Sequence, residues 1–175
     1  MMQKLKFVRE QEAHLVELRL SGSRGEDEGE FVLTMTYLSG DLGLKTGTLV
    51  ARFTASYQTP AGNASGHVDL GQGDTKIEVP KLRGMGIGSF MMSILIGLVQ
   101  SSLPQVEVAM IYLASEDAKT DEERDRRNGF WRKLGYTFTY YDSEERSGYS
   151  NWMMSSQLIR PAEELRSGWI VEELE

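Results

Sequence analysis

The sequence contains no cysteine and no hydrophobic run long enough to cross a membrane. The absence of cysteine excludes disulfides and thiolate metal ligands, and it fits a reducing compartment. No apolar stretch approaches the ~18 residues of a membrane-spanning helix. The first ten residues, MMQKLKFVRE, lack the apolar segment of a secretory signal. We therefore expect a cytoplasmic protein with no membrane partner.

Positive charge is also scarce, because 19 Lys and Arg residues stand against 26 Asp and Glu residues and the net charge is −7. The acidic residues concentrate in GEDEGE (25–30) and EELE (172–175), which are typical of a solvated loop and tail. A duplex-binding protein usually presents a basic face, so no nucleic-acid partner is expected. The two histidines, His14 and His67, lack the spacing of a metal site or a catalytic triad, and no metal site is predicted.

A chain of 175 residues with 40% hydrophobic residues suits one domain with its own core. We expect this domain to cover residues 1–160, followed by a charged tail (161–175). Alternation of apolar and polar residues predicts strands at 16–20, 31–37 and 49–57, with turn-rich stretches between them. The short run TKIEV (75–79) predicts one more strand.

The second half of the chain alternates between helical and strand patterns. The run SFMMSILIGLVQSS (89–102) is long for a strand and predicts a buried helix, whereas VEVAMIYLA (106–114) predicts a central strand. The segment 120–135 predicts a helix with a capping box at Thr120 and Glu123 and a stop at Gly135. Two further strands are predicted around 136–141 and 152–158. This order of elements predicts an α+β or mixed α/β layer structure.

Between the strand at 75–79 and the first helix lies PKLRGMGIGSF (80–90), with glycine at every second position. A strand that leads through a glycine-rich turn into a helix can bind an anion, because the helix N-terminus offers unpaired N–H groups and the positive end of its dipole. Glycine lets the backbone approach a ligand closely, and Arg83 can contact a phosphate. A tight turn with close packing explains the glycines equally well.

Two common phosphate-binding loops do not fit this turn. A Walker loop requires Gly-Lys-Ser/Thr, and Gly88-Ser89 lacks the lysine. The dinucleotide-binding fingerprint requires G-x-G-x-x-G and an acidic residue ~20 positions later. The spacing here is G-x-G-x-G, and that later position falls near Gln105 and Val106.

A third pattern does fit. The stretch Pro80-x-x-Arg83-Gly84-x-Gly86-Ile87-Gly88, followed by an apolar helix, resembles the acyl-CoA pyrophosphate loop of the GCN5-related N-acetyltransferase (GNAT) superfamily. The stretch FWRKLGY (130–136) is similar to that family's later motif, commonly Phe/Leu-Tyr-x-Lys-x-Gly-Phe. Together the motifs cover about residues 76–138. The resemblance implies a GNAT-like acyl-CoA N-acyltransferase fold, with a central, mostly antiparallel sheet and flanking helices. It also implies transfer of an acetyl group from acetyl-CoA to an amine.

In this family the loop N–H groups bind the pyrophosphate, and the preceding strand hydrogen-bonds the pantetheine arm. The resemblance implies that Glu78 and Val79 form the strand edge and that Trp131 lies beside the acyl-CoA arm. Glu78 is the best-placed acid for a general base, although an ordinary exposed strand carboxylate explains it as well. The implied pyrophosphate loop comprises Arg83, Gly84, Met85, Gly86, Ile87, Gly88 and Ser89.

Two residues depart from the family pattern. The tyrosine that often protonates the departing thiolate corresponds to Trp131, which has no acidic hydroxyl and could pack either on the acyl-CoA arm or in the core. An asparagine commonly found seven residues earlier corresponds to Arg124, with Asn128 nearby but out of register. Water or another tyrosine could supply the proton, and the sequence does not choose among Tyr136, Tyr140, Tyr141 and Tyr149.

The acceptor side departs further from the family. GNAT proteins usually place two helices between their first and second strands, and these helices shape the acceptor site, whereas residues 15–60 here predict strands and loops. The acceptor is therefore expected only as a small-molecule or protein amine, and an acidic surface would suit a cationic one. A homodimer is compatible with the sequence. The rival hypothesis is a non-catalytic acyl-CoA-binding or protein-interaction module, which Trp131 and the missing helices favour.

Overall fold

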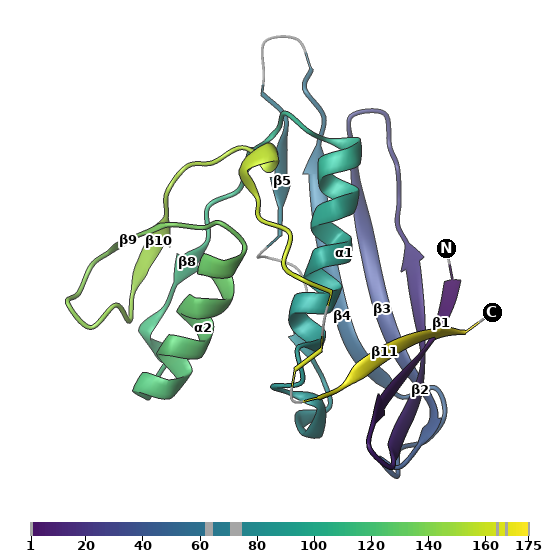
Figure 1. Ribbon diagram of the computed structural model, residues 1–175. Helices are drawn as coiled ribbons and strands as arrows, with labels where there is room; N and C mark the ends of the chain where they lie inside the picture. The colour runs from purple at the N-terminus through teal and green to yellow at the C-terminus, as the bar shows by residue number, and fades with distance from the viewer. Residues whose placement is uncertain (1, 62–64, 71–74, 164, 167, 175) are drawn as a thin grey trace.

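The computed structural model describes residues 2–61, 65–70, 75–163, 165–166 and 168–174. They form a mixed α+β fold in which a large, mostly antiparallel sheet packs against helix α1 (Ile87–Ser102). Helix α2 (Asp121–Lys133) lies to one side, next to a second, smaller sheet (Figure 1). The expectation of an α+β layer structure is confirmed.

The large sheet has the strand order β11-β1-β2-β3-β4-β5-β7, with β6 also paired to β4. All neighbouring strands run antiparallel except β5 and β7. The predicted strands at 16–20, 31–37 and 49–57 are confirmed as parts of β2, β3 and β4. The strands are β1 (Met2–Arg9), β2 (Glu12–Ser21), β3 (Glu28–Gly40), β4 (Leu49–Gln58), β5 (His67–Asp69), β6 (Lys76–Ile77), β7 (Glu107–Val108) and β11 (Ile170–Leu174).

The core lies between one face of this sheet and α1, which packs on β3, β4 and β6. Alternate strand residues point toward the helix, because successive side chains of a strand face opposite sides. On the opposite face Lys4 pairs in register with Glu17, and Arg19 with Thr34, as expected for a face in water. The buried side chains that meet across the layer include Val16, Leu18, Leu33, Met35 and Phe53 from the sheet and Phe90, Met91, Leu95 and Val99 from α1.

Both predicted helices are confirmed. Helix α2 begins at the predicted capping box, in which Thr120 Oγ1 accepts from the Glu123 N–H at 3.2 Å and the Glu123 carboxylate accepts from the Thr120 N–H at 3.1 Å. Its first turn carries acidic residues and its last turn basic ones, which complements the helix dipole. It ends just before the predicted stop at Gly135.

The single central strand predicted at 106–114 is wrong. The segment instead divides into β7, at the end of the large sheet, and β8 (Tyr112–Leu113). The strand β8 belongs to a small sheet of order β8-β10-β9, with β9 (Phe138–Tyr140) and β10 (Gly148–Ser150). The Ala109 N–H still donates to Val68 of the large sheet at 2.8 Å, but Ile111 already bonds to Ser150 of β10 through both its N–H and its carbonyl. The chain therefore leaves one sheet for the other within two residues.

Of the last two predicted strands, one is confirmed and one is wrong. The strand around 136–141 is confirmed as β9 (Phe138–Tyr140), but its partner β10 is Gly148–Ser150, and the strand predicted at 152–158 is wrong. There the chain forms a short 3-10 helix, η3 (Ser155–Gln157). The Ser155 hydroxyl donates to the Leu103 carbonyl and accepts from the Val106 N–H. These side-chain hydrogen bonds favour a turn over the backbone hydrogen bonds of a paired β-strand.

The C-terminal segment contributes an edge strand to the large sheet. Residues of β11 pair antiparallel with β1, and Lys6 forms an ion pair with Glu172 at 3.3 Å. The acidic side chains predicted for a tail thus line an exposed sheet edge, where charge disfavours pairing with another chain. Trp169, just before β11, is buried.

Candidate functional site

The glycine turn joins β6 to α1 through the short 3-10 helix η1 (Pro80–Leu82). Two backbone hydrogen bonds close this helix, from the Leu82 N–H to Val79 at 3.0 Å and from the Arg83 N–H to Pro80 at 3.1 Å. Gly84 and Gly86 then adopt φ values of 86° and 91°, a region that residues with a side chain rarely occupy. Two of the three glycines are therefore required by the path of the backbone.

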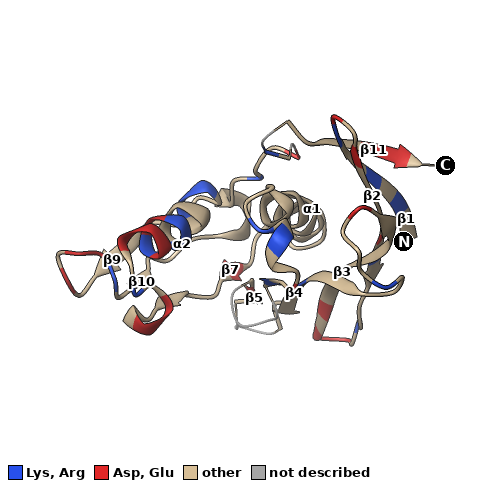
Figure 2. Ribbon diagram, turned by 90° about the horizontal axis from the view of Figure 1, so that it is seen from below, with Lys and Arg blue, Asp and Glu red and all other residues tan. Residues whose placement is uncertain are grey.

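The N-terminus of α1 is left open by the protein itself. Gly86 is the N-cap, no side chain of the described chain caps it, and the first turn holds no acidic residue. Helix α2 differs, because its capping box and three acidic residues occupy its N-terminus. In Figure 2 the start of α2 is accordingly red, whereas blue marks the turn before α1. The unpaired N–H groups and the positive dipole end of α1 remain available to an anion.

Arg83 lies folded back along the strand that precedes the turn. Its Nε and Nη2 donate to the Ile77 carbonyl at 3.3 and 3.2 Å, and its Nη1 has no hydrogen-bond partner among the described residues. These two bonds hold the guanidinium beside the turn and leave part of its donor capacity unused. The side chain is exposed.

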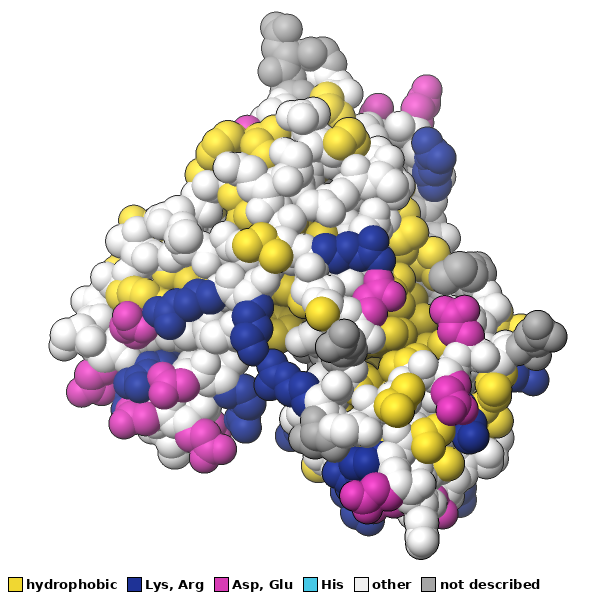
Figure 3. Space-filling model, viewed as in Figure 1, with side chains coloured by type: hydrophobic (Ala, Val, Ile, Leu, Met, Phe, Trp, Pro, Cys, Tyr) yellow, Lys and Arg dark blue, Asp and Glu magenta, His cyan; other side chains and the backbone are white. Residues whose placement is uncertain are grey.

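The third glycine, Gly88, joins the two halves of the site. It lies in the first turn of α1, and a Cβ at this position would stand 3.7 Å from the Phe130 ring and 3.8 Å from Ile77 and Phe53. The segment 80–90 and the segment 130–136 therefore meet where α1 approaches α2. Figure 3 shows Lys and Arg side chains bordering the hollow between α2 and the lower end of α1.

An aromatic cluster follows Phe130. The Phe130 and Trp131 rings are 5.0 Å apart and the Trp131 and Tyr136 rings 5.5 Å, both edge to face. Trp131 is half-buried in this cluster. Tyr136 is 2% exposed, and its hydroxyl has no hydrogen-bond partner in the described structure. Burial, assisted by the charge of Asp69, raises the pKa of the Tyr136 hydroxyl far above its ordinary value.

Of the other candidate tyrosines, Tyr140 and Tyr149 lie in the small sheet, and Tyr141 directly follows β9. The Tyr140 hydroxyl accepts from Arg132 at 2.9 Å. Tyr141 and Tyr149 contact one another at 5.7 Å between ring centroids, and Tyr141 is 68% exposed. Of the four tyrosines considered from the sequence, ring contact with Trp131 is found for Tyr136.

Glu78 and Val79 stand at the end of β6, where the turn begins. The Glu78 carboxylate is exposed and forms an ion pair with Lys76 at 3.1 Å, while its N–H donates to the Val50 carbonyl at 2.8 Å. Val79 is buried, and its carbonyl accepts from Leu82. The Glu78 carboxylate is therefore open to solvent, whereas the Val79 side chain serves packing.

Arg124 and Asn128, which fall near the position of the family's asparagine, hold a hairpin in place. Asn128 is 1% exposed and donates through Nδ2 to the Glu145 carbonyl at 2.9 Å. Arg124 bonds to Asp121 and to the Glu144 carbonyl, both at 3.1 Å. Both side chains thus tie α2 to the β9–β10 hairpin.

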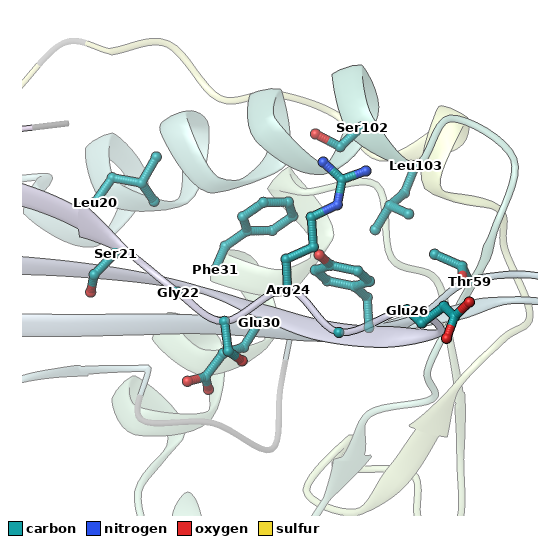
Figure 4. Close-up of a pocket in the computed structure, with 13 residues that line it drawn as sticks. Leu20, Ser21, Gly22, Arg24, Glu26, Glu30, Phe31, Thr59, Ser102 and Leu103 are labelled. Atoms are coloured by element: carbon teal, nitrogen blue, oxygen red, sulfur yellow. The ribbon is translucent and has the colours of Figure 1, made fainter.

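Two pockets could not be predicted from the sequence, because each is formed by segments far apart in the chain. One, of about 530 Å³, lies between the β1–β2 hairpin and the glycine turn. The other, of about 470 Å³, lies at the opposite end of α1, beside Ser102. In that second pocket Phe31 stacks on Tyr57 at 5.1 Å, and Figure 4 shows Arg24 extending toward Ser102 while Glu26 and Glu30 point away.

Comparison of the chain with protein-family models, with curated proteins and with solved structures found no match. Within the described ranges, no three His, Asp or Glu side chains form a group that could hold a metal ion. In that same part of the chain no helix is both long and apolar enough to pass through a membrane. Function is therefore inferred from the residues and their geometry.

Proposed function

We propose that the protein is an N-acetyltransferase with a GNAT-like fold, which transfers an acetyl group from acetyl-CoA to an amine. The observation that carries this proposal is the open N-terminus of α1. Two left-handed glycines precede it, Arg83 stands beside it, and Gly88 brings it against Phe130 of the second motif. A pyrophosphate would meet backbone donors, the helix dipole and a cation at one place.

The chemistry requires a base that takes the proton of the amine, donors that stabilise the oxyanion, and a proton source for the thiolate. The amine nitrogen attacks the thioester carbonyl and loses a proton, the C–N bond forms, and the C–S bond breaks to release a thiolate that takes up a proton. Glu78 is assigned as the base, either directly or through water, because its carboxylate is exposed at the end of the strand that enters the turn. Backbone N–H groups would stabilise the oxyanion.

Water is the group best suited to protonate the departing thiolate. Trp131 has no hydroxyl, and the raised pKa of Tyr136 means that its phenol holds the proton more tightly than an ordinary tyrosine. A thiol has an ordinary pKa of ~8.5, so proton transfer from Tyr136 to a thiolate would run strongly uphill. The aromatic cluster therefore serves as a packing surface beside the turn.

Two observations favour a second candidate, a non-catalytic acyl-CoA-binding module. The Glu78 carboxylate is ion-paired with Lys76. Trp131 stands where the resembled motif has a tyrosine, and the tyrosine in ring contact with it is the buried Tyr136. This candidate shares the pyrophosphate site and differs only in turnover.

The test combines binding and turnover. Calorimetric titration with acetyl-CoA measures binding at the turn, and thiol release against a panel of polyamines, aminoglycosides and lysine peptides measures transfer. Binding with turnover supports the enzyme, and binding without turnover of any amine supports the second candidate. No binding at millimolar acetyl-CoA contradicts both.

A further inference from the structure

The pocket of about 470 Å³ lies at the C-terminal end of α1, the end opposite to the glycine turn. Helix α1 has 16 residues, so its two ends are about 24 Å apart at a rise of about 1.5 Å per residue. The pocket is lined by the ends of β2, β3 and β4, by the loop that joins β2 to β3, and by Ser102 and Leu103. We name it the distal pocket. It shares no lining residue with the site proposed for acetyl-CoA.

An aromatic pair forms one side of the distal pocket. Phe31 and Tyr57 stack with 5.1 Å between their ring centroids. Tyr57 is buried, and its hydroxyl lies against Gly29, where a Cβ would stand only 2.5 Å from the hydroxyl oxygen. Phe31 is half-buried, so part of its ring remains open to a ligand. Leu20 and Leu103 add aliphatic surface, and the pocket therefore has the apolar lining that small-molecule sites usually have.

Arg24 is the charged group that extends into the distal pocket. Figure 4 shows its side chain directed toward Ser102, whereas the carboxylates of Glu26 and Glu30 point away. Within the described chain the Arg24 guanidinium forms no hydrogen bond and no ion pair. Its N–H donors are therefore available, and their planar arrangement matches the two oxygens of a carboxylate.

The backbone around Arg24 is held in place by the protein itself. Arg24 forms a β-bridge with Gly29, and the Glu30 N–H donates to the Ser23 carbonyl at 3.0 Å. A Cβ at Gly22 would overlap the Glu30 carbonyl oxygen, so the loop lies close against β3. The negative dipole end of α1 also favours a guanidinium at this place. Because the loop is already ordered, a ligand would lose little free energy in arranging it.

We propose that the distal pocket binds a small aromatic carboxylic acid, whose carboxylate pairs with Arg24 and whose ring packs on the open part of Phe31. A cationic ligand would instead meet an unpaired guanidinium. The negative dipole end of α1 disfavours an anion, but this effect is weaker than a charge-assisted hydrogen bond. The site does not depend on the proposed acetyltransferase function.

The test follows binding by two-dimensional ¹⁵N–¹H NMR, with benzoate as the probe and benzamide as its neutral match. Benzoate should cause saturable shifts of the amides of residues 22–26 and 102–103. Benzamide should bind about tenfold more weakly or worse, because it cannot form the ion pair. Cyclohexanecarboxylate keeps the charge and lacks the flat ring, so it should bind several-fold more weakly than benzoate.

Variants assign the binding to the two side chains. Arg24→Gln should weaken benzoate binding by about tenfold or more, and Arg24→Lys, which keeps the charge without the planar donors, should be intermediate. Phe31→Leu keeps an apolar side chain and should weaken binding several-fold. Arg126→Gln removes an exposed arginine of α2 outside the pocket and should leave the affinity unchanged. Circular dichroism confirms the fold of each variant, and if Arg24→Gln does not fold, Arg24→Lys and the three probes decide.

Several results would overturn the proposal. These are equal affinity for benzoate and benzamide or for benzoate and cyclohexanecarboxylate, an affinity that the Arg24 variants leave unchanged, or shifts that lie outside the distal pocket. Binding of benzylamine in place of benzoate, or no saturable shift up to the solubility limit of benzoate, would overturn it too. Acetyl-CoA is titrated separately and read from the amides of residues 83–89, so failure of this proposal and failure of the acetyltransferase are recorded independently.

Discussion

Gly88 of α1 and Phe130 of α2 stand in van der Waals reach of one another: a Cβ on Gly88 would lie 3.7 Å from the Phe130 ring. This contact joins the glycine turn to the aromatic segment that follows it about forty residues later in the chain. The bare backbone of the turn thus lies at the meeting point of two segments, and not only at the start of a helix.

Gly86→Glu should abolish acetyl-CoA binding while the protein still folds. The carboxylate would occupy the open N-terminus of α1 and repel a pyrophosphate. The measurement is calorimetric titration, with circular dichroism to confirm the fold. Gly47→Glu is a matched control, because Gly47, in the loop between β3 and β4, has φ 89° and nothing within 4 Å of its Cβ position. Arg83→Ala should weaken binding less. Unchanged affinity in a folded Gly86→Glu protein would leave the turn with a packing role only.

The glycines of the turn should respond differently to alanine. Gly84→Ala should lower the free energy of unfolding by about 1 kcal/mol, because φ is 86° there and the open space around it leaves backbone strain as the only cost. Gly88→Ala should raise it by up to ~1 kcal/mol, because alanine favours a helix and the new contacts are of ordinary length. Urea denaturation of both variants measures the difference, and the opposite order would contradict the assigned geometry.

Glu78→Gln should lower the rate of thiol release by roughly 10²–10⁴-fold with any amine that the wild type accepts, the usual contribution of a general base. Acetyl-CoA affinity should stay nearly unchanged, since the exposed carboxylate precedes the glycine turn and would not contact the pyrophosphate. Lys76→Ala is the control, because it removes the ion pair and keeps the base. Equal rates for wild type and Glu78→Gln would make Glu78 an ordinary strand residue.

Trp131→Tyr introduces the tyrosine that is common in the GNAT motif that FWRKLGY (130–136) resembles. If a tyrosine hydroxyl is all that the site lacks, this variant should release thiol faster than the wild type, whereas Trp131→Phe should keep only the ring contacts with Phe130 and Tyr136. Steady-state thiol release at saturating acetyl-CoA distinguishes them. Identical rates for the two variants would indicate that water supplies the proton.

Asp142 should make stability depend on pH in the acid range. Its carboxylate accepts from the N–H groups of Arg146 and Ser147 and from the Ser147 hydroxyl, and these bonds, the Arg146 N–H first, lower the pKa of Asp142 to about 2. A lowered pKa stabilises the fold above the ordinary value near 3.8, and this contribution is lost as the pH falls through about 2. Asp142→Asn should therefore be less stable than wild type at pH 7.

The difference between Asp142→Asn and wild type should shrink as the pH falls from about 4 to about 2. Urea midpoints measured across this range test it, with Glu26→Gln in the exposed loop between β2 and β3 as the control. A constant difference at every pH would show that the Asp142 charge contributes nothing.

The sequence by itself determined the elements whose signals are local. The capping box of α2 needs only Thr120 and Glu123, three residues apart. The alternation of apolar and polar residues in 49–57 predicts a strand with a buried face, whichever strands lie beside it. The glycine turn was also predictable, because a strand, a glycine-rich turn and an apolar helix are adjacent in the chain. The roles of Glu78 and Trp131 stay predictions.

Only the tertiary structure decided what depends on partners distant in the chain. The run 106–114 has the composition of one strand, yet Val68 and Ser150 draw its two halves into different sheets. The acidic C-terminal segment becomes a strand because β1 offers a free edge. The pocket of about 530 Å³ is lined by His14, Lys81 and Trp169 from three distant segments, and no local sequence pattern predicts that arrangement. Long-range hydrogen bonds and burial set these features, so they appear only when the chain is folded.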